Sequence, residues 1–361
     1  MTKFDRHIIR RFLSGFLFLV GALIVFFIVL HYVESIDDFM DRGATMKDVF
    51  FVYYLNYIPE IVRLTSPLAI FLSCVYLTGK LSQQLQLAAL QTGGVSLYRL
   101  LIPYLIVAVS VTGFMLWFNG WVVPKTNTVV LEFEEQYLKD APRQVDLNDI
   151  HRQNSPGSIV TVGYYDRKTR VAHRVSLQEF DVGSRLRSRI DAPRMDWIDT
   201  LKTWRLQEPV FRTFSPAGDE TRIHRRTLDT TLTIRPRDFA RTERDAESMT
   251  IPVAREYIDA LRRSGVSNTG RTLVTYYAKY SYPFANLILT LIGVPLAAVR
   301  RRGGQAIRLG IGLLTAFAYL ALQKLTEPFG YSGELHPLIT AWLPHVLFFV
   351  FSIILILRVK K

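Results

Sequence analysis

The stretch FLSGFLFLVGALIVFFIVL runs from Phe12 to Leu30 without a single charged side chain. A helix rises about 1.5 Å per residue, so a run of about 20 apolar residues crosses the roughly 30 Å hydrocarbon core of a bilayer. The run is too long for the apolar region of a signal peptide, and no small-residue cleavage site accompanies it. It therefore predicts a membrane-spanning helix.

Runs of the same kind recur along the chain, in which 49% of the 361 residues are hydrophobic. They are Leu64–Gly79, Leu100–Val123, Tyr280–Val299 and Pro337–Leu357. A weaker run from Ala306 to Leu325 includes two charged residues. Together these runs predict an α-helical membrane protein with six spans. The lone Cys74 lies inside the second run, which excludes an intrachain disulfide.

Lysine and arginine cluster at the ends of these runs, and the chain carries a formal net charge of +13. The clusters are Lys3, Arg6, Arg10 and Arg11, then Lys80 and Arg99, then Arg300, Arg301 and Arg302, and finally Arg358, Lys360 and Lys361. The short loops on the opposite side carry acids instead. Because positive loops stay in the cytoplasm, both termini and residues 83–100 are predicted to be cytoplasmic. Basic residues at helix ends do not form the continuous face that nucleic acid binding requires.

Residues 123 to about 264 are polar and carry charges of both signs, which predicts a separate folded domain. Apolar or β-branched side chains alternate with polar ones at a two-residue period, for example over residues 228–234. Turn signals at residues 155–157, 181–183 and 215–218 separate such runs. Short strands at this spacing predict an all-β sandwich, jelly roll or open barrel. A helix over residues 252–263 is expected to close the domain, with Gly265 just past its end.

The predicted organisation has three parts. Residues 1–122 hold spans one to three, with a cytoplasmic coupling helix over about residues 80–94. Residues 123–268 form a periplasmic, jellyroll-like β domain, and residues 269–361 hold spans four to six. Long domains cross the membrane regardless of their charge, so the arginines of the β domain do not contradict this. Its role stays open between accepting a strand at a sheet edge, burying a ligand, and only holding shape.

Charged residues inside a span are costly and face a bundle interior or a wet cavity. Glu60 and Arg63 lie three residues apart in the outer half of span two, so they share a helix face. Two interpretations stay open: the pair neutralises itself, or it lines a substrate path. His31, near the outer end of span one, is expected at the interface rather than as a ligand. Lys279, at the outer start of span four, is expected to snorkel to the lipid phosphates.

No nucleotide-binding or metal-binding pattern is present in the sequence. The chain lacks the phosphate loop G-x-x-x-x-G-K-[ST], and no arrangement of nucleophile and base stands out. Six spans are fewer than most single-chain secondary transporters use, and no inverted repeat is evident. If the protein moves a substrate actively, the energy is expected to come from another subunit.

Between the second and third runs lies QQLQLAALQTGGVSLYRL, residues 83–100. Leu81, Leu85 and Ala88 form one stripe of a helix, and the glycine pair at residues 93–94 ends it. Ser96 is placed to cap the next span. The segment predicts a helix of about three turns on which a cytoplasmic ATPase pushes. A membrane-surface helix is the alternative, but its polar face would lack the usual lysine and arginine.

These residues resemble the LptF/LptG lipopolysaccharide-export permeases. Residues 86–96, QLAALQTGGVS, are similar to the family's coupling segment E-L-x-A-L-R-A-x-G-V-S. In order along the chain, DRHI at 5–8 resembles D-R-Y-I, KYSYPFA at 279–285 resembles K-x-x-x-P-L-A, RRGG at 301–304 resembles a basic-glycine turn, and AWLP at 341–344 matches A-W-L-P. The resemblance covers the whole chain. The opening residues and the loop after span one are closer to the LptG branch.

The resemblance implies a permease subunit without catalytic or metal-binding residues, whose ATP and magnesium are bound by a partner. The partners that it implies are two copies of an LptB-like ATPase, an LptF-like paralogous permease, an LptC-like periplasmic protein and lipopolysaccharide itself. Spans one and five would form lateral gates, and the β-jellyroll would pass the lipid onward. The residues implied to meet the ATPase are Leu85, Gln86, Ala89, Leu90, Gln91, Gly93 and Gly94.

Two features depart from the family pattern. Gln86 stands where the family usually has a glutamate that meets the ATPase. Members of the LptG type also tend to place lysine or arginine around the cavity mouth, whereas this chain carries several acids there. The candidates for the mouth are His31, Arg42, Glu60, Arg63 and Lys125. The cargo is therefore expected to differ in charge, or the partner to supply the cations.

The sequence thus predicts a multi-pass inner-membrane permease that extracts lipopolysaccharide. A non-transporting transducer, which passes ATPase strokes to a periplasmic partner, is the alternative from a different class. A membrane anchor or assembly scaffold is the third.

Overall fold

The computed structural model describes residues 2–137, 148–166, 169–181, 183, 185–214, 219–239, 245–264, 269–299 and 304–358. The chain divides into two compact units. The helical unit comprises Met1–Lys139, Ala246–Ile251 and Gly270–Lys361, and the β unit comprises Asp140–Asp245 and Pro252–Thr269. The predictions made for residues 300–303, 360–361, 215–218, 182 and 265 lie outside the described residues.

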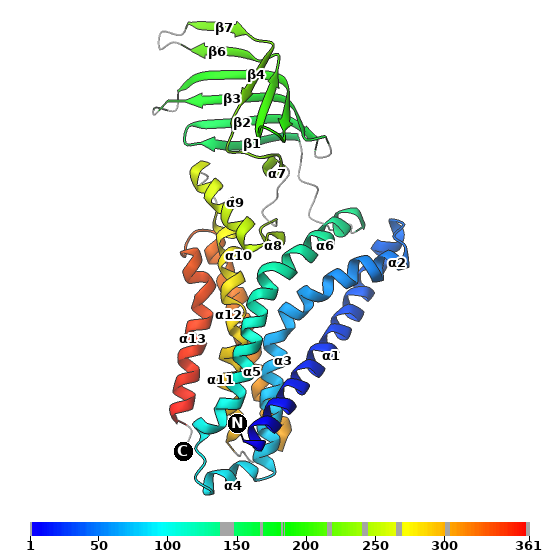
Figure 1. Cartoon of the computed structure of the whole chain (residues 1–361), viewed down its shortest axis with the longest axis vertical. Coiled ribbons are helices and arrows are strands. Elements are labelled where there is room, and N and C mark those ends of the chain that lie inside the picture. The colour runs from blue at the N-terminus through cyan, green and yellow to red at the C-terminus, as the bar shows by residue number, and fades with distance from the viewer. Residues whose placement is uncertain are drawn as a thin grey trace. The chain divides into compact units, whose positions relative to one another are not determined.

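The helical unit is built from long rods, two of which pass through a π-helical segment (Figure 1). α1 spans Lys3–Asp41. One composite rod contains α2 (Met46–Asp48), η1 (Val49–Tyr54) and α3 (Leu55–Gln83), and another contains α5 (Leu97–Trp117), η2 (Phe118–Val122) and α6 (Val123–Tyr137). The other helices of this unit are α4 (Gln86–Thr92), α8 (Asp245–Ser248), α10 (Gly270–Ser281), α11 (Phe284–Ala298), α12 (Gly304–Tyr331) and α13 (Pro337–Arg358).

Five of these rods are long and apolar enough to cross a membrane: Lys3–Asp41, Met46–Gln83, Leu97–Tyr137, Ala306–Tyr331 and Pro337–Arg358. α10 and α11 together satisfy the same test, but they are bent by 52° at their junction. Pro283 lies in this junction and lacks the N–H group that would continue the hydrogen-bond ladder. With the bent pair counted as one span, the described helices account for the six predicted spans.

α1 is longer than a membrane is thick. Its 39 residues extend about 58 Å, roughly twice the hydrocarbon thickness. The charge-free run from Phe12 to Leu30 lies in its middle, and the helix continues to Asp41 with several acidic side chains. The N-terminus, α4 and the end of α13 lie at one end of the helical unit, called the α4 end below, and α2 and the end of α6 lie at the opposite, far end (Figure 1).

The first boundary between the units differs from the one expected at residue 123. α6 continues the rod of α5 as far as Tyr137, so these residues belong to the helical unit. Lys125 and Glu132 on α6 are exposed, whereas Val130 and Phe133 are buried. A helix with one buried stripe holds charges on its other face, and for that reason the polar composition did not mark the boundary.

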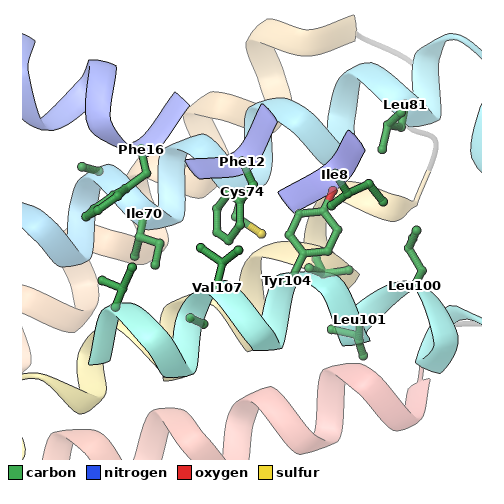
Figure 2. Packing of buried hydrophobic residues seen from close by; sticks show 14 of the residues in the cluster. Ile8, Phe12, Phe16, Ile70, Cys74, Leu81, Leu100, Leu101, Tyr104 and Val107 are labelled. Carbon is green, nitrogen blue, oxygen red and sulfur yellow. The ribbon is translucent and has the colours of Figure 1, made fainter. Parts of the chain in front are cut away.

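The core at the α4 end joins α1, α3 and α5. Figure 2 shows the side chains of Ile8, Phe12 and Phe16 from α1 among Ile70 and Cys74 from α3 and Tyr104 and Val107 from α5. In a membrane, helix contacts depend on close packing and on hydrogen bonds between helices. Ser73 supplies one such bond, because its Oγ donates to the Phe12 carbonyl at 3.0 Å. Thr78 supplies another by donating to the Tyr104 hydroxyl at 3.0 Å.

The β unit contains an eight-stranded antiparallel sheet in the order β1-β2-β3-β4-β5-β8, with β6 pairing β4 and β7 pairing β6. The strands are β1 (Asn148–Ser155), β2 (Ser158–Asp166), β3 (Val171–Phe180), β4 (Leu186–Ile198), β5 (Thr203–Gln207), β6 (Val210–Phe214), β7 (Glu220–His224) and β8 (Thr227–Thr230). The sheet forks along β4, where residues 194–198 pair with β5 and residues 188–191 pair with β6. The predicted fold class, a helical membrane protein with an inserted all-β domain, is confirmed.

Trp204 is at the centre of the β core. Its ring is fully buried, packs against Trp197 and Phe239, and donates from Nε1 to the Ile234 carbonyl at 2.7 Å. The alternation over residues 228–234 had predicted a strand along the whole stretch, but β8 ends at Thr230. The following residues leave the sheet, and Leu232 and Ile234 pack on the core. The short α7 (Pro236–Phe239) follows. α9 (Ile251–Ser264) matches the predicted closing helix.

Acid sensitivity is expected at the β6–β7 edge. Glu220 accepts hydrogen bonds from Arg222 and Arg212, and these lower its pKa from 4.5 to about 2. Since the folded-state pKa lies below the unfolded one, the stabilisation is complete above about pH 4.5 and is lost as the pH falls toward 2. Hydrogen exchange of β6 and β7 in the detergent-solubilised chain, corrected for intrinsic rates, is expected to rise over this window. Glu220→Gln is expected to remove the pH dependence, and an unchanged profile in that variant would contradict the assignment.

Candidate functional site

α4 differs from the single helix expected over about residues 80–94. α3 ends at Gln83, and Leu85 adopts a left-handed backbone conformation with φ of 58°. A non-glycine residue rarely adopts this conformation, and here it redirects the chain so that a new helix begins at Gln86. The predicted element is therefore the last turn of α3, a sharp turn, and α4 with about two turns of its own.

Leu87 is the buried side chain of α4, with 6% of its surface exposed. It packs in the cluster that contains Ile8 and Phe12 of α1. The predicted stripe of Leu81, Leu85 and Ala88 is wrong, because Leu85 is 50% exposed and Ala88 is also exposed. The left-handed turn at Leu85 interrupts the helical spacing, so residues before and after it do not share a face.

Most of the residues expected to meet an ATPase lie on the open side of this segment. Leu85, Gln86, Ala89, Gln91, Gly93 and Gly94 are exposed, and Leu90 is half-buried. A small, mostly apolar hollow beside them is lined by Leu87, Leu90, Gln91, Val95, Ser96, Leu97, Leu100 and Ala298. The structure therefore brings the predicted residues together as one surface, formed by a helix side and an adjoining hollow.

A Schellman motif ends α4. The Val95 N–H donates to the Leu90 carbonyl at 2.9 Å, and the Gly94 N–H donates to the Gln91 carbonyl at 3.0 Å. Gly94 occupies the left-handed position, with φ of 82°. Two residues later Ser96 caps α5, accepting from the Arg99 N–H at 3.3 Å. Both ends of the connection are thus fixed by hydrogen bonds.

Gln86 begins α4 on its exposed side. Its Nε2 donates to Gln84 Oε1 at 3.1 Å, so two neutral amides lie together at the joint. α4 itself contains no ionisable residue. A partner would meet this surface through neutral hydrogen bonds and apolar contacts rather than through an ion pair.

Glu60 and Arg63 pair with each other at the far end of the bundle. Arg63 Nε donates to Glu60 Oε2 at 2.8 Å, and Nη2 contacts Oε1. Asn127 of α6 also donates to Glu60, at 3.4 Å, and the guanidinium lies 5.1 Å from the centre of the Tyr282 ring. This geometry favours the self-pairing interpretation. The pair also connects α3 to α6 and to the junction of α10 and α11.

Lys279 is buried, with 6% of its surface exposed, so the expectation that it snorkels to the lipid is wrong. Its Nζ donates to the Glu247 carbonyl of α8 at 3.1 Å, and its own carbonyl accepts from Asn119 of η2 at 3.0 Å. The backbone carbonyl of α8 gives the ammonium group a partner inside the protein. No lipid phosphate is needed to explain its position.

His31 lies in a box of aromatic rings formed by Phe39, Tyr53, Tyr54 and Tyr57. Tyr53 donates to Glu134 Oε1 at 2.9 Å, so its oxygen is left to accept from His31 Nε2 at 3.2 Å. The other ring nitrogen, Nδ1, lies 3.2 Å from the Tyr54 hydroxyl. With Tyr53 donating to Glu134, this chain of bonds places a proton on Nε2. It joins α1, η1 and α6.

Arg42 and Lys125 lie outside both clusters. Arg42 ends α1, where its backbone N–H donates to the Asp38 carbonyl, and its side chain is exposed. Lys125 is exposed near the start of α6. The five mouth candidates are therefore split between one ion pair, one aromatic box and two exposed cations.

Sequence reasoning missed Tyr53, Asn127 and Glu134 as partners of the predicted residues. Tyr53 and Tyr57 are four residues apart and mark a polar-aromatic face, which was the available signal. Tyr53 lies within η1, and π-helical segments occur frequently at functional sites. Asn127 and Glu134 carry no such signal, since only the packing of α6 against α3 brings them close.

The family model described as lipopolysaccharide export system permease LptF/LptG matches residues 6–358. The chain belongs to this family. Two curated relatives, each named lipopolysaccharide export system permease protein LptG, come from Escherichia coli K12 and from Escherichia coli O6:H1 strain CFT073. Each is 20% identical over 351 residues, which covers 90% of this chain and 91% of the relative.

Membership of the LptF/LptG family confirms the resemblance drawn from the sequence, and the two relatives favour the LptG branch. Together with the apolar rods, it identifies the chain as a multi-pass inner-membrane permease of lipopolysaccharide export. A transport subunit of this kind fits the absence of a catalytic motif in the sequence.

Gly94 is expected to control the orientation of α4. A β-branched side chain at φ of 82° is strained, so Gly94→Val should disrupt the Schellman motif by roughly 1–3 kcal/mol of local stability. If a cytoplasmic ATPase binds this surface, binding of the purified ATPase to the solubilised permease is expected to weaken while membrane insertion continues. Gly93→Ala is the matched control, because an added Cβ there meets neighbouring atoms at an ordinary 3.4 Å. Equal binding by both variants would contradict this role.

Glu60 and Arg63 are expected to behave as a coupled pair in stability. Removing the carboxylate in Glu60→Leu strands a largely buried guanidinium, which typically costs about 3–5 kcal/mol. Arg63→Glu, which places two acids together, should destabilise at least as much. The double variant Glu60→Leu/Arg63→Met is expected to recover most of the loss. Thermal unfolding in detergent measures all three, and additive losses in the double variant would argue against pairing.

Proposed function

We propose that this chain takes lipopolysaccharide out of the inner membrane, driven by ATP hydrolysis on a separate cytoplasmic subunit. The surface around α4 carries the proposal. A short helix is fixed by hydrogen bonds between two spanning rods, and its open side is exposed. A displacement of α4 is therefore expected to move both α3 and α5. The sequence contains no phosphate loop, so ATP and magnesium belong to the partner in this proposal.

The topology in this proposal follows the distribution of basic residues. Lys3, Arg6, Arg10 and Arg11 precede the first apolar run, and Lys80 and Arg99 flank α4. The positive-inside rule then places the α4 end and both termini in the cytoplasm. The β unit, inserted between α6 and α10, is in the periplasm in this arrangement.

Three proposed protein partners correspond to three surfaces. An LptB-like ATPase dimer meets the α4 surface of this permease and the equivalent surface of a second one. That second permease, an LptF-like paralogue, covers part of α1, of whose most apolar stretch only 11% is buried in this chain. An LptC-like periplasmic protein receives lipid from the β unit, where β7 is exposed along its whole length.

The substrate contacts in this proposal depend on which cations are already paired. The charge of Arg63 is balanced by Glu60, so Arg63 positions helices rather than clamping a phosphate. Arg42 and Lys125 are exposed and remain suitable for lipid phosphates. His31 is engaged by the hydroxyl groups of Tyr53 and Tyr54, so its ring nitrogens already have partners.

Reconstitution tests the proposal. The permease, its paralogue and the ATPase are placed in liposomes that contain lipopolysaccharide, and transfer to an added periplasmic acceptor is measured with and without ATP. ATP-dependent transfer is expected, and a complex with a catalytically inactive ATPase serves as the control. ATP hydrolysis without transfer would overturn the transport function and leave the transducer as the better interpretation.

A further inference from the structure

Asp5 and Arg99 form an ion pair between the first turn of α1 and the first turn of α5. Arg99 Nη2 lies 2.6 Å from Asp5 Oδ2, although the two residues are 94 positions apart in the chain. Asp5 is 5% exposed, and the Arg99 side chain is 41% exposed. The contact is therefore partly shielded from solvent, unlike an ion pair between two mobile surface side chains.

Both partners are held by helix caps. The Thr2 N–H donates to Asp5 Oδ2 at 2.8 Å, and the Asp5 N–H donates back to Thr2 Oγ1 at 3.2 Å, which forms a capping box. The Arg99 N–H is itself bound by the Ser96 cap of α5. The ion pair thus connects two capped helix starts. Because the caps restrict both residues, a movement of the start of α5 is expected to displace the start of α1.

Arg99 is also close to α4 along the chain. The Schellman motif at Gly94 leads directly to the Ser96 cap, so α4 and the start of α5 are joined by a short, hydrogen-bonded connection. Packing supports the same route. Leu87 of α4 lies in one cluster with Ile8 of α1 and with Leu100 of α5, and Figure 2 shows the last two from close by.

α1 is the span that such a connection is best placed to move. Only 11% of its most apolar stretch is buried, against 67% for the Met46–Gln83 rod. Besides Asp5, its polar contacts with other rods include the Ser73 bond to the Phe12 carbonyl and the bonds of His31. A long helix held along a narrow strip shifts as a unit when its first turn is displaced.

We propose that Asp5 and Arg99 are a positioning pair that carries a displacement of α4 to α1. The proposal rests on the proposed function, because it takes α4 as the surface on which an ATPase acts. It adds a defined route from that surface to a span that shares one packed cluster with α4.

The test uses the full permease complex in liposomes, with Asp5→Asn, Arg99→Gln and the double variant. Asparagine at position 5 can still accept from Thr2, so the capping box is kept while the charge is removed. Spin labels at Val33 of α1 and Val109 of α5, which are 68% and 57% exposed, report the nucleotide-driven change in distance between these helices. Lipopolysaccharide transferred per ATP hydrolysed is the second measurement.

Each variant is expected to lose the distance change and to transfer roughly fivefold less lipopolysaccharide per ATP, a typical size for coupling between sites. The double variant is expected to be no worse than either single variant, since one contact is lost in all three. Arg99→Lys, which keeps the charge, is expected to recover part of the coupling. Lys324→Gln is the matched control, because it breaks an ion pair with Glu327 on α12.

Two results would overturn the proposal. One is an unchanged distance response in Asp5→Asn. The other is recovery of wild-type coupling in the double variant, which would mean that the pair only avoids a stranded charge. The distance measurement separates this proposal from the proposed function. If the wild-type complex transfers no lipid, the transport function fails, yet loss of the distance change in Asp5→Asn still supports the pair.

Discussion

A bilayer core offers no hydrogen-bond partners, and the arrangement of the helical unit depends on this constraint. An ionisable side chain that is buried within the spans is stabilised by a partner inside the protein. Glu60 pairs with Arg63, Lys279 reaches the Glu247 carbonyl, and Arg308 donates to the Gly79 carbonyl at 2.8 Å. Each of these contacts connects different helices or reinforces one, so the cost of burying charge also sets how the rods are held together.

The same constraint decides where the backbone departs from a regular helix. The sharp turn at Leu85 lies beyond the apolar runs, and its backbone groups are satisfied by bonds such as that from the Leu85 N–H to the Ser82 carbonyl at 3.2 Å. Among the described residues of the rods, the irregular places include the π-helical segments and the bend between α10 and α11. These irregular places adjoin the His31 box, the Lys279 contact and the Glu60–Arg63 pair. Irregular backbone and buried polar side chains therefore occur together toward the far end of the unit.

Prediction from sequence was most successful where the cause is local. The apolar runs predicted the spans, Ser96 predicted the cap of α5, and the glycine pair predicted the end of α4. It was least successful where one backbone conformation changes the meaning of residue spacing. The left-handed Leu85 replaced the expected stripe with Leu87, and the continuation of α5 into α6 moved the domain boundary past residue 123.

By itself, the sequence determined the membrane location, the inserted β domain, the family and which residues form the exposed surface around α4. Hydropathy, turn residues and short motifs act over a few neighbouring positions, so they can be recognised without the tertiary structure. Only the tertiary structure decided which candidate residues act together. It paired Glu60 with Arg63, enclosed His31 among tyrosines, and brought Asp5 to Arg99. Such contacts join residues that are far apart in the chain, or select one of several possible partners, and both depend on how whole helices pack against one another.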